Sequence, residues 1–100
     1  MALYLLRLDS LKLERSGENP FYFDIVLGGR DPDGHARRLQ FDQVTDMQFG
    51  SILPNVSAQV SITDIRFWQR EEARFSVTEE EHGQFSFKCI GYSDRSPPRE

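Results

Sequence analysis

The sequence has one cysteine, two lysines and no long hydrophobic run, and each shortage excludes a class of protein. The single cysteine, Cys89, excludes an internal disulfide and favours a reducing compartment such as the cytoplasm. The apolar stretch near the N-terminus covers only residues 2–6, and no basic segment precedes it. A membrane helix needs roughly 20 apolar residues, so we expect neither export nor a membrane anchor.

Positive charge is also scarce in this chain. The net charge is −4, and the 12 lysines and arginines are scattered along the sequence. Binding to phosphate backbones relies on clustered cations, because the release of counterions supplies most of the affinity. We therefore expect no nucleic-acid partner. The excess of arginine over lysine is typical of a GC-rich genome and indicates a bacterial source.

The sequence contains no recognisable catalytic motif. No serine lies in a G-x-S-x-G pattern, and Gly28-Gly29 lacks the lysine and further glycine of a phosphate-binding loop. The run Glu79-Glu80-Glu81-His82 places acidic and basic groups together, but in a solvated hairpin loop their environments stay alike. Acid–base catalysis needs unlike environments. We interpret this run as a charged loop tip that discourages edge pairing, and we expect no enzyme activity and no cofactor.

Metal binding is not indicated either. The only histidines, His35 and His82, have no ligand spacing with Cys89. The segment Asp31-Pro32-Asp33-Gly34 is similar to the start of a calcium loop, but the twelfth position of that loop falls on Asp42, within an expected strand. We interpret Asp31–Gly34 as part of a tight turn and expect no metal site.

The strongest pattern in the chain is an alternation of apolar and polar residues with a period of two. Such spacing indicates strands with one buried face and one wet face. The first of these segments also comes near helical spacing, but no capping pattern begins a helix there. The expected strands cover residues 3–13, 21–27, 37–44, 56–63, 73–77 and 85–90, with a further short strand at 44–49.

The phase of this alternation changes at several points. It flips after Asp9-Ser10 and again after Asp64, which indicates bulges or strands that bend between sheets. Six to seven short strands predict an all-β fold, and we favour an antiparallel β-sandwich over a small, partly open barrel. The expected domain covers residues 1–92. Residues 93–100 lack core material and are expected to form a frayed tail.

The segment 65–72 is the candidate binding site. If its apolar residues point inward, then Arg66, Trp68 and Arg70 project together from the other face. Tryptophan and arginine are enriched at protein-binding hot spots. We predict that these three residues bind a protein partner. The alternative is that Trp68 is buried at a sheet corner with its N–H bonded locally.

Two further binding modes are open from the sequence. Because unpaired strand edges are templates for pairing, the chain is also expected to self-associate, with a symmetric homodimer as the usual form. The other mode is a carbohydrate- or small-ligand-binding module in which Tyr22, Trp68 and Tyr92 serve as stacking platforms. This mode requires exposed aromatic rings.

The middle and C-terminal parts of the chain resemble a known kind of protein. The string from Leu39 to Cys89 resembles small bacterial all-β domains of unknown function, some of them accessory or immunity-type proteins in toxin neighbourhoods. The resemblance covers residues 37–90 and implies a non-catalytic binding role, without assigning any functional residue. The segments on which the resemblance rests are Leu39–Met47, Val60–Ile65, Arg66–Gln69, Arg74–Val77 and Phe85–Cys89.

Overall fold

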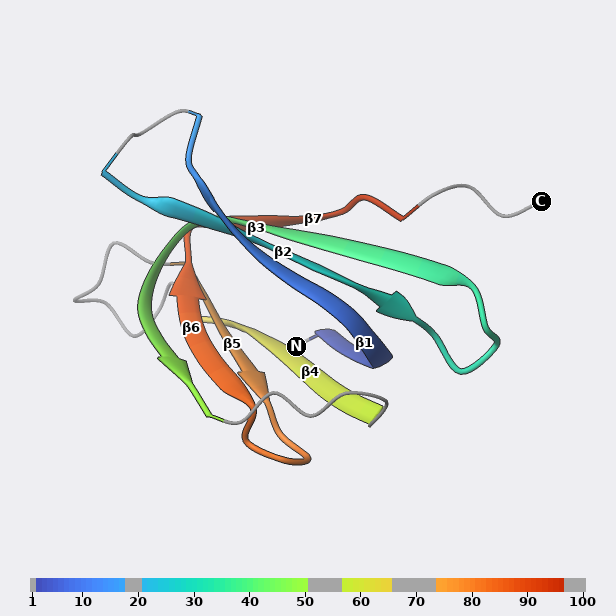
Figure 1. Ribbon diagram of the computed structural model, residues 1–100. Coiled ribbons are helices and arrows are strands. Elements are labelled where there is room, and N and C mark those ends of the chain that lie inside the picture. The colour runs from blue at the N-terminus through green and yellow to red at the C-terminus, as the bar shows by residue number, and fades with distance from the viewer. Residues whose placement is uncertain (1, 18–20, 51–56, 66–73, 97–100) are drawn as a thin grey trace.

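The computed structural model describes residues 2–17, 21–50, 57–65 and 74–96 (Figure 1). These residues form seven antiparallel strands. None of them belongs to a helix, so this part of the chain has no helix able to span a membrane. The strands are β1 (Ala2–Arg15), β2 (Phe23–Arg30), β3 (Ala36–Phe49), β4 (Ser57–Asp64), β5 (Phe75–Glu79), β6 (Phe85–Cys89) and β7 (Gly91–Asp94).

Within the described residues, six of the strands close into a barrel, and the seventh, β7, pairs only with β3. The order is β2-β1-β4-β5-β6-β3, and the pairing of β2 with β3 closes the circle. β7 pairs with β3 through Leu39–Asp42. The all-β prediction is confirmed, but the preference for a sandwich is wrong. The bends of β1 and β3 keep one continuous sheet instead of dividing it into two.

Each bent strand changes its neighbour along its length. The first part of β1, up to Arg7, pairs with β4, and the part from Arg7 to Arg15 pairs with β2. A register shift between Leu8 and Ser10 marks the bend. This is the bulge that the phase flip after Asp9-Ser10 predicted. Because the bulge adds one residue, the inward-facing parity changes there.

Two further bulges bend β3. Its first part pairs with β2 and its last part with β6, with register shifts in both pairings. Gln43 and Asp46 have φ angles of 50° and 52°, in the left-handed region that L-residues rarely adopt. The backbone N–H of Gln43 donates to Asp24 Oδ1 on β2 at 2.9 Å. Asp46 Oδ2 lies 3.6 Å from Lys88 Nζ on β6.

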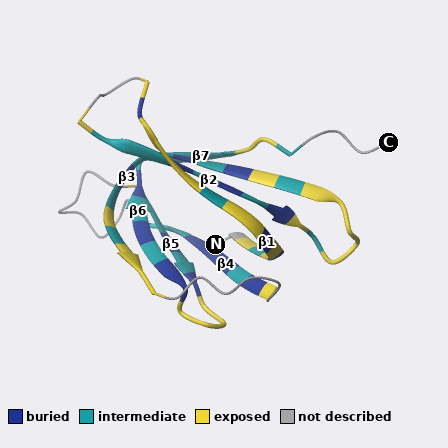
Figure 2. Cartoon of the chain, viewed as in Figure 1, coloured by how far each residue is buried: buried dark blue, intermediate teal, exposed yellow. Residues whose placement is uncertain are grey.

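The barrel interior is filled by apolar side chains from all six of its strands. Figure 2 marks the buried residues along the strands in dark blue. The rings of Phe41 and Phe87 meet edge to face with their centroids 5.1 Å apart, a preferred aromatic geometry. Full burial of each such ring contributes about 1.5–3 kcal/mol. The other core residues are Leu6, Leu8, Ile25, Leu27, Leu39, Val44, Ala58, Val60, Ile62, Val77, Phe85 and Cys89.

The strand predictions are close to the observed elements. The first segment is a strand and not a helix, and the expected short strand at 44–49 is the continuation of β3. β5 ends at Glu79, two residues later than the sequence predicted. β7 includes Ser93 and Asp94, which the sequence analysis placed in the C-terminal tail. The Asp94 carboxylate is 2.8 Å from Arg37 Nη2.

Candidate functional site

The protein-binding residues chosen from the sequence, Arg66, Trp68 and Arg70, lie outside the described residues. Their role stays a prediction. The described chain reaches Ile65, which is buried and whose backbone N–H donates to the Arg74 carbonyl at 2.8 Å.

Two of the three aromatic residues proposed as platforms for a small ligand, Tyr22 and Tyr92, lie within the described residues. Tyr92 packs against the core, with its ring centroid 6.2 Å from that of Phe41 and 5.1 Å from that of Phe75. Tyr22 is partly buried, and Trp68 is not among the described residues. Tyr92 and Tyr22 are both partly buried, and their role as stacking platforms for a sugar stays a prediction.

Cys89 is a core residue without nucleophilic character. Its side chain is fully buried. Burial raises the pKa of the Cys89 thiol to about 12, the Asp42 carboxylate adds to the shift, and a backbone hydrogen bond from Gly91 opposes it. A reactive thiol needs a low pKa and access to solvent. The structure therefore agrees with the interpretation of Cys89 as a small buried hydrophobe.

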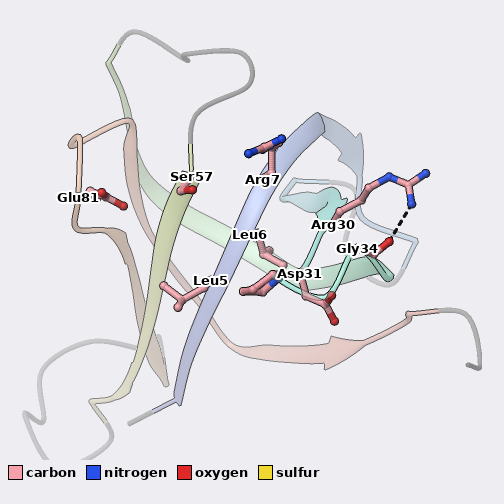
Figure 3. A pocket seen from close by; sticks show the side chains of 9 residues that line it. Leu5, Leu6, Arg7, Arg30, Asp31, Gly34, Ser57 and Glu81 are labelled. Atoms are coloured by element: carbon pink, nitrogen blue, oxygen red, sulfur yellow. Dashed lines mark hydrogen bonds between the residues drawn. The ribbon is translucent and has the colours of Figure 1, made fainter.

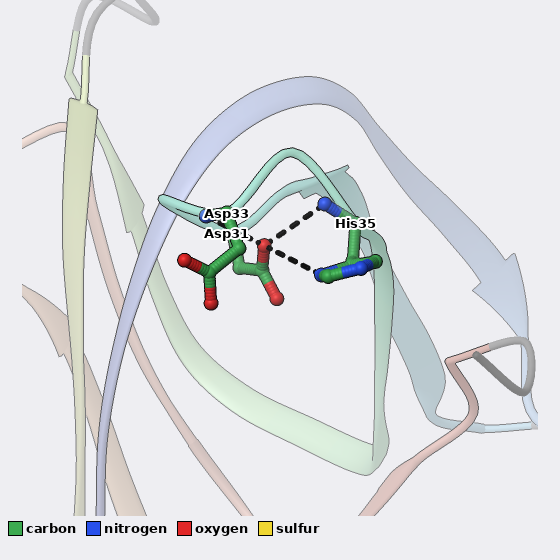
Figure 4. Close-up of side chains that lie close together, drawn as sticks. All are labelled: Asp31, Asp33 and His35. Carbon is green, nitrogen blue, oxygen red and sulfur yellow. Dashed lines mark hydrogen bonds and ion pairs between the residues drawn. The ribbon is translucent and has the colours of Figure 1, made fainter. Parts of the chain in front are cut away.

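The turn between β2 and β3 brings Asp31, Asp33 and His35 together (Figure 4). Asp31 Oδ1 accepts the backbone N–H groups of Asp33 at 3.0 Å and of His35 at 2.9 Å. His35 Nδ1 lies 3.7 Å from the same oxygen. The potential ligand atoms lie within 4.8 Å of one another, but the contacts are those by which an aspartate shapes a turn. The predicted tight turn is confirmed.

Glu79 does not belong to a solvated loop tip, and that interpretation is wrong for this residue. Its side chain is 1% exposed, whereas Glu80, Glu81 and His82 are exposed. Burial favours the neutral form, but hydrogen bonds to backbone N–H groups outweigh burial and lower the pKa of Glu79. The donors are the backbone N–H groups of Gln59 (3.1 Å), Glu81 (2.8 Å), His82 (2.9 Å) and Gln84 (3.2 Å).

The buried carboxylate of Glu79 therefore organises the β5–β6 turn. It also accepts a bond at 3.4 Å from Gln84 Nε2, and Gln84 is itself fully buried. A signal for this role was present in the sequence, because Phe75, Val77 and Glu79 share the inward parity of β5. Hydrogen bonds to a charged acceptor are stronger than neutral ones, so the turn is held firmly in place.

A pocket of about 470 Å³ lies at the end of the barrel between β1, β4 and the turns β2–β3 and β5–β6 (Figure 3). Apolar lining comes from Leu5, Leu6 and Pro32. These side chains offer apolar contact beside the charged groups of the lining. The polar and remaining lining residues are Arg7, Arg30, Asp31, Gly34, Ser57 and Glu81.

Two arginines dominate the rim of this pocket. Arg7 of β1 and Arg30 of β2 are direct partners in the register of these strands, and both are exposed. Arg30 Nη1 donates to the Gly34 carbonyl at 2.9 Å. The sequence analysis missed this pair because the two residues are far apart in the chain and only the strand register brings them together.

Apolar side chains continue from this pocket along the outer face of β1. Leu3 and Leu5 are 48% and 49% exposed, and they share the outward parity of Arg7. Their inward-facing neighbours Leu6 and Leu8 are buried in the core. The fold therefore uses only one face of this apolar strand and leaves leucines on the other.

Comparison with known families gives a match that covers most of the chain. The model of a family described as Immunity protein PIM8 matches residues 3–93. Searches of curated proteins and of solved structures gave no match. The matched range runs from the beginning of β1 into β7 and thus includes the whole barrel.

Proposed function

Because the chain belongs to the Immunity protein PIM8 family, we propose that it acts as an immunity protein that binds a protein toxin and blocks it without catalysing a reaction. The observation that carries this proposal is the family match over residues 3–93. A fully buried, protonated Cys89 and the absence of a catalytic motif in the sequence support a binding role.

We also propose a setting for this activity. The chain acts in the cytoplasm of a bacterium, where a single unpaired cysteine stays reduced. Self-association is part of the proposal. Among the described residues β7 pairs with a strand on one side only, which is β3. Its other side is a strand edge, and small β domains pair readily through such edges. Light scattering of the purified chain tests it: a strict monomer at high concentration contradicts a homodimer.

The function is tested by co-expression with candidate protein toxins, beginning with any product of a gene that adjoins the gene of this chain. We expect that a sensitive bacterial host survives when both proteins are made and dies when the toxin is made alone. The purified proteins are expected to form a complex of fixed stoichiometry by size-exclusion chromatography with light scattering. Lack of both protection and complex formation contradicts the proposal.

A titration separates binding from catalysis. For a binding protein, inhibition of the toxin is complete only when about one equivalent of binding sites has been added. An enzyme that modifies or destroys the toxin would act at far lower ratios and leave the toxin inactive after separation of the two chains. Recovery of toxin activity after denaturation and separation is therefore the expected result.

A further inference from the structure

We propose that the toxin docks on the outer face formed by Leu3, Leu5 and Arg7 of β1 and Arg30 of β2, and that it presents a carboxylate to the two arginines. We call these four residues the Leu–Arg face. The inference rests on the proposed function and adds to it the surface that binds and the chemistry that the partner must supply.

Two positive charges lie opposite each other on the Leu–Arg face. Arg7 and Arg30 lie directly opposite each other in the β1–β2 pairing, and like charges in this position destabilise a sheet. Within the described parts of the chain neither guanidinium forms an ion pair, although Arg30 donates to the Gly34 carbonyl. In the free protein the Arg30 guanidinium is turned toward the Gly34 carbonyl, away from Arg7 (Figure 3). An anion would neutralise both charges once Arg30 turns back toward Arg7, and a free protein keeps the cost of two opposed like charges when the site serves binding.

The carboxylates nearest to the arginines do not fill this role. Asp31 and Glu81 also line the pocket. Asp31 Oδ1 is used within the β2–β3 turn, where it accepts two backbone N–H groups. Neither carboxylate forms an ion pair with Arg7 or Arg30 among the residues described. Both guanidinium groups are thus left for a carboxylate from outside, which an arginine binds in a bidentate manner.

An apolar surface lies beside these two charges. Leu3 and Leu5 point outward from β1 and are about half exposed, although the barrel needs only the inward face of this strand. Leu5 lines the pocket (Figure 3). Pro32 adds to the apolar lining. Apolar side chains next to arginines, with a concave site for an anchor, are typical of the centre of a protein–protein interface.

The two arginines and the two leucines together determine which kind of molecule fits the Leu–Arg face. A small inorganic anion would use the arginines but would leave the leucines in water. A protein uses both, because one carboxylate side chain meets the arginines while neighbouring apolar side chains cover Leu3 and Leu5. The partner is therefore a folded protein with an acidic residue at the centre of an apolar contact patch.

The test uses the toxin against which co-expression shows protection, and calorimetry measures the affinity of this toxin for the purified chain. We expect Arg7→Glu and Arg30→Glu each to weaken binding at least 30-fold, in the range of hot-spot residues. The matched control is Lys12→Glu, which makes the same change of charge on the exposed outer side of β1 beyond the bulge. We expect this control to bind within threefold of the wild type.

The stability of the same variants gives a second readout. Arg7→Glu places a carboxylate opposite Arg30, which exchanges a repulsive cross-strand pair for an attractive one. We therefore expect an unchanged or higher melting temperature together with weaker binding. A loss of binding that comes from misfolding would lower the melting temperature instead, and that outcome would contradict the proposal.

Other results separate the inference from the function on which it rests. If the wild type protects and both arginine variants bind as well as the Lys12→Glu control, the Leu–Arg face is wrong and the immunity function stands. If the wild type fails to bind the toxin, both are wrong. If Arg7→Glu dissociates a dimer without affecting toxin binding, the occupant of the Leu–Arg face is a second copy of this chain and not the toxin. If inorganic phosphate stabilises the wild type without competing with the toxin, the occupant is a small anion and not the toxin.

Discussion

The backbone N–H of Gln43 donates to Asp24 Oδ1 at 2.9 Å, and this bond joins β2 to the bulge at which β3 bends. Gln43 has a φ of 50°, a left-handed conformation that costs an L-residue about 1–2 kcal/mol. The carboxylate of Asp24 compensates part of this cost because it satisfies a donor that the irregular ladder would leave without a partner.

Removal of this acceptor is expected to destabilise the barrel. Asp24→Ala should lower the free energy of unfolding by about 1–3 kcal/mol, since it leaves the Gln43 N–H without its acceptor. Asp24→Asn keeps a carbonyl oxygen at the same place and should lose less. Urea denaturation of the three proteins measures both differences. Equal midpoints for Asp24→Ala and the wild type would show that the bulge does not depend on this bond.

Glu79 provides a prediction about pH. Burial alone would raise its pKa, but four backbone N–H donors bring the pKa below 4.5. A carboxylate with a lowered pKa stabilises the folded state above the ordinary pKa, and this contribution is lost as the pH falls through the folded value. The chain should therefore lose stability below about pH 4.5. Glu79→Gln should be less stable by about 3 kcal/mol at pH 7 and should show a flatter profile in acid.

The matched control for this variant is Glu80→Gln. Glu80 is the next residue and is exposed, so its substitution should change stability by no more than about 0.5 kcal/mol. Thermal denaturation between about pH 3 and pH 7 compares the two variants with the wild type. Parallel profiles for all three proteins would refute the role assigned to the buried carboxylate.

Gly29 gives a steric prediction at the β1 bulge. A Cβ at this position would lie 2.4 Å from the Arg7 carbonyl oxygen and 3.2 Å from Leu8 Cα. These are backbone atoms of the paired strand, so they cannot move aside without opening the sheet. Gly29→Ala should destabilise the protein by about 2–4 kcal/mol, as overpacking with a backbone shift does.

Gly17 is the control for the glycine substitution. Nothing lies within 4 Å of a Cβ built there, so Gly17→Ala should be neutral or should stabilise by a few tenths of a kcal/mol through the unfolded state. Guanidinium denaturation followed by tryptophan fluorescence measures both variants. Equal losses at the two glycines would contradict close approach as the cause.

Cys89 gives a prediction about reactivity. With a thiol pKa of about 12 and no exposed surface, it should not react with a disulfide reagent at pH 8 in the folded protein. In denaturant the thiol should react fully within minutes. Because burial raises the pKa of the Cys89 thiol in the folded protein, the stability that its neutral form contributes is fully present below the ordinary thiol pKa. This contribution is lost as the pH rises toward 12. Rapid labelling of the native protein would contradict this picture.

The sequence was most informative where one strand faces the core along its length. β4 and β6 were predicted closely because each keeps its parity from end to end. The bulge after Leu8 was predicted because the leucines change parity there. Closure of the barrel was not predicted, because closure requires that β3 pairs with β2 along its first part and with β6 along its last part. Local alternation does not contain that information.

The residues of the proposed site and the buried Glu79 were harder to predict for a related reason. Arg7 and Arg30 are ordinary surface residues in the sequence, and only their register makes them a pair. Glu79 was grouped with Glu80 and Glu81 by composition, although its parity within β5 placed it with the core. The search for aromatic and arginine hot spots led to Arg66, Trp68 and Arg70, and these residues stay a prediction.

The division of β1 between two neighbours has a consequence for the order of events during synthesis. Ala2 pairs with Ile62, so the initial half of β1 has no partner in the sheet until β4 has been made. Contacts of such separation slow folding, and the exposed apolar residues of β1 are vulnerable to aggregation during that interval.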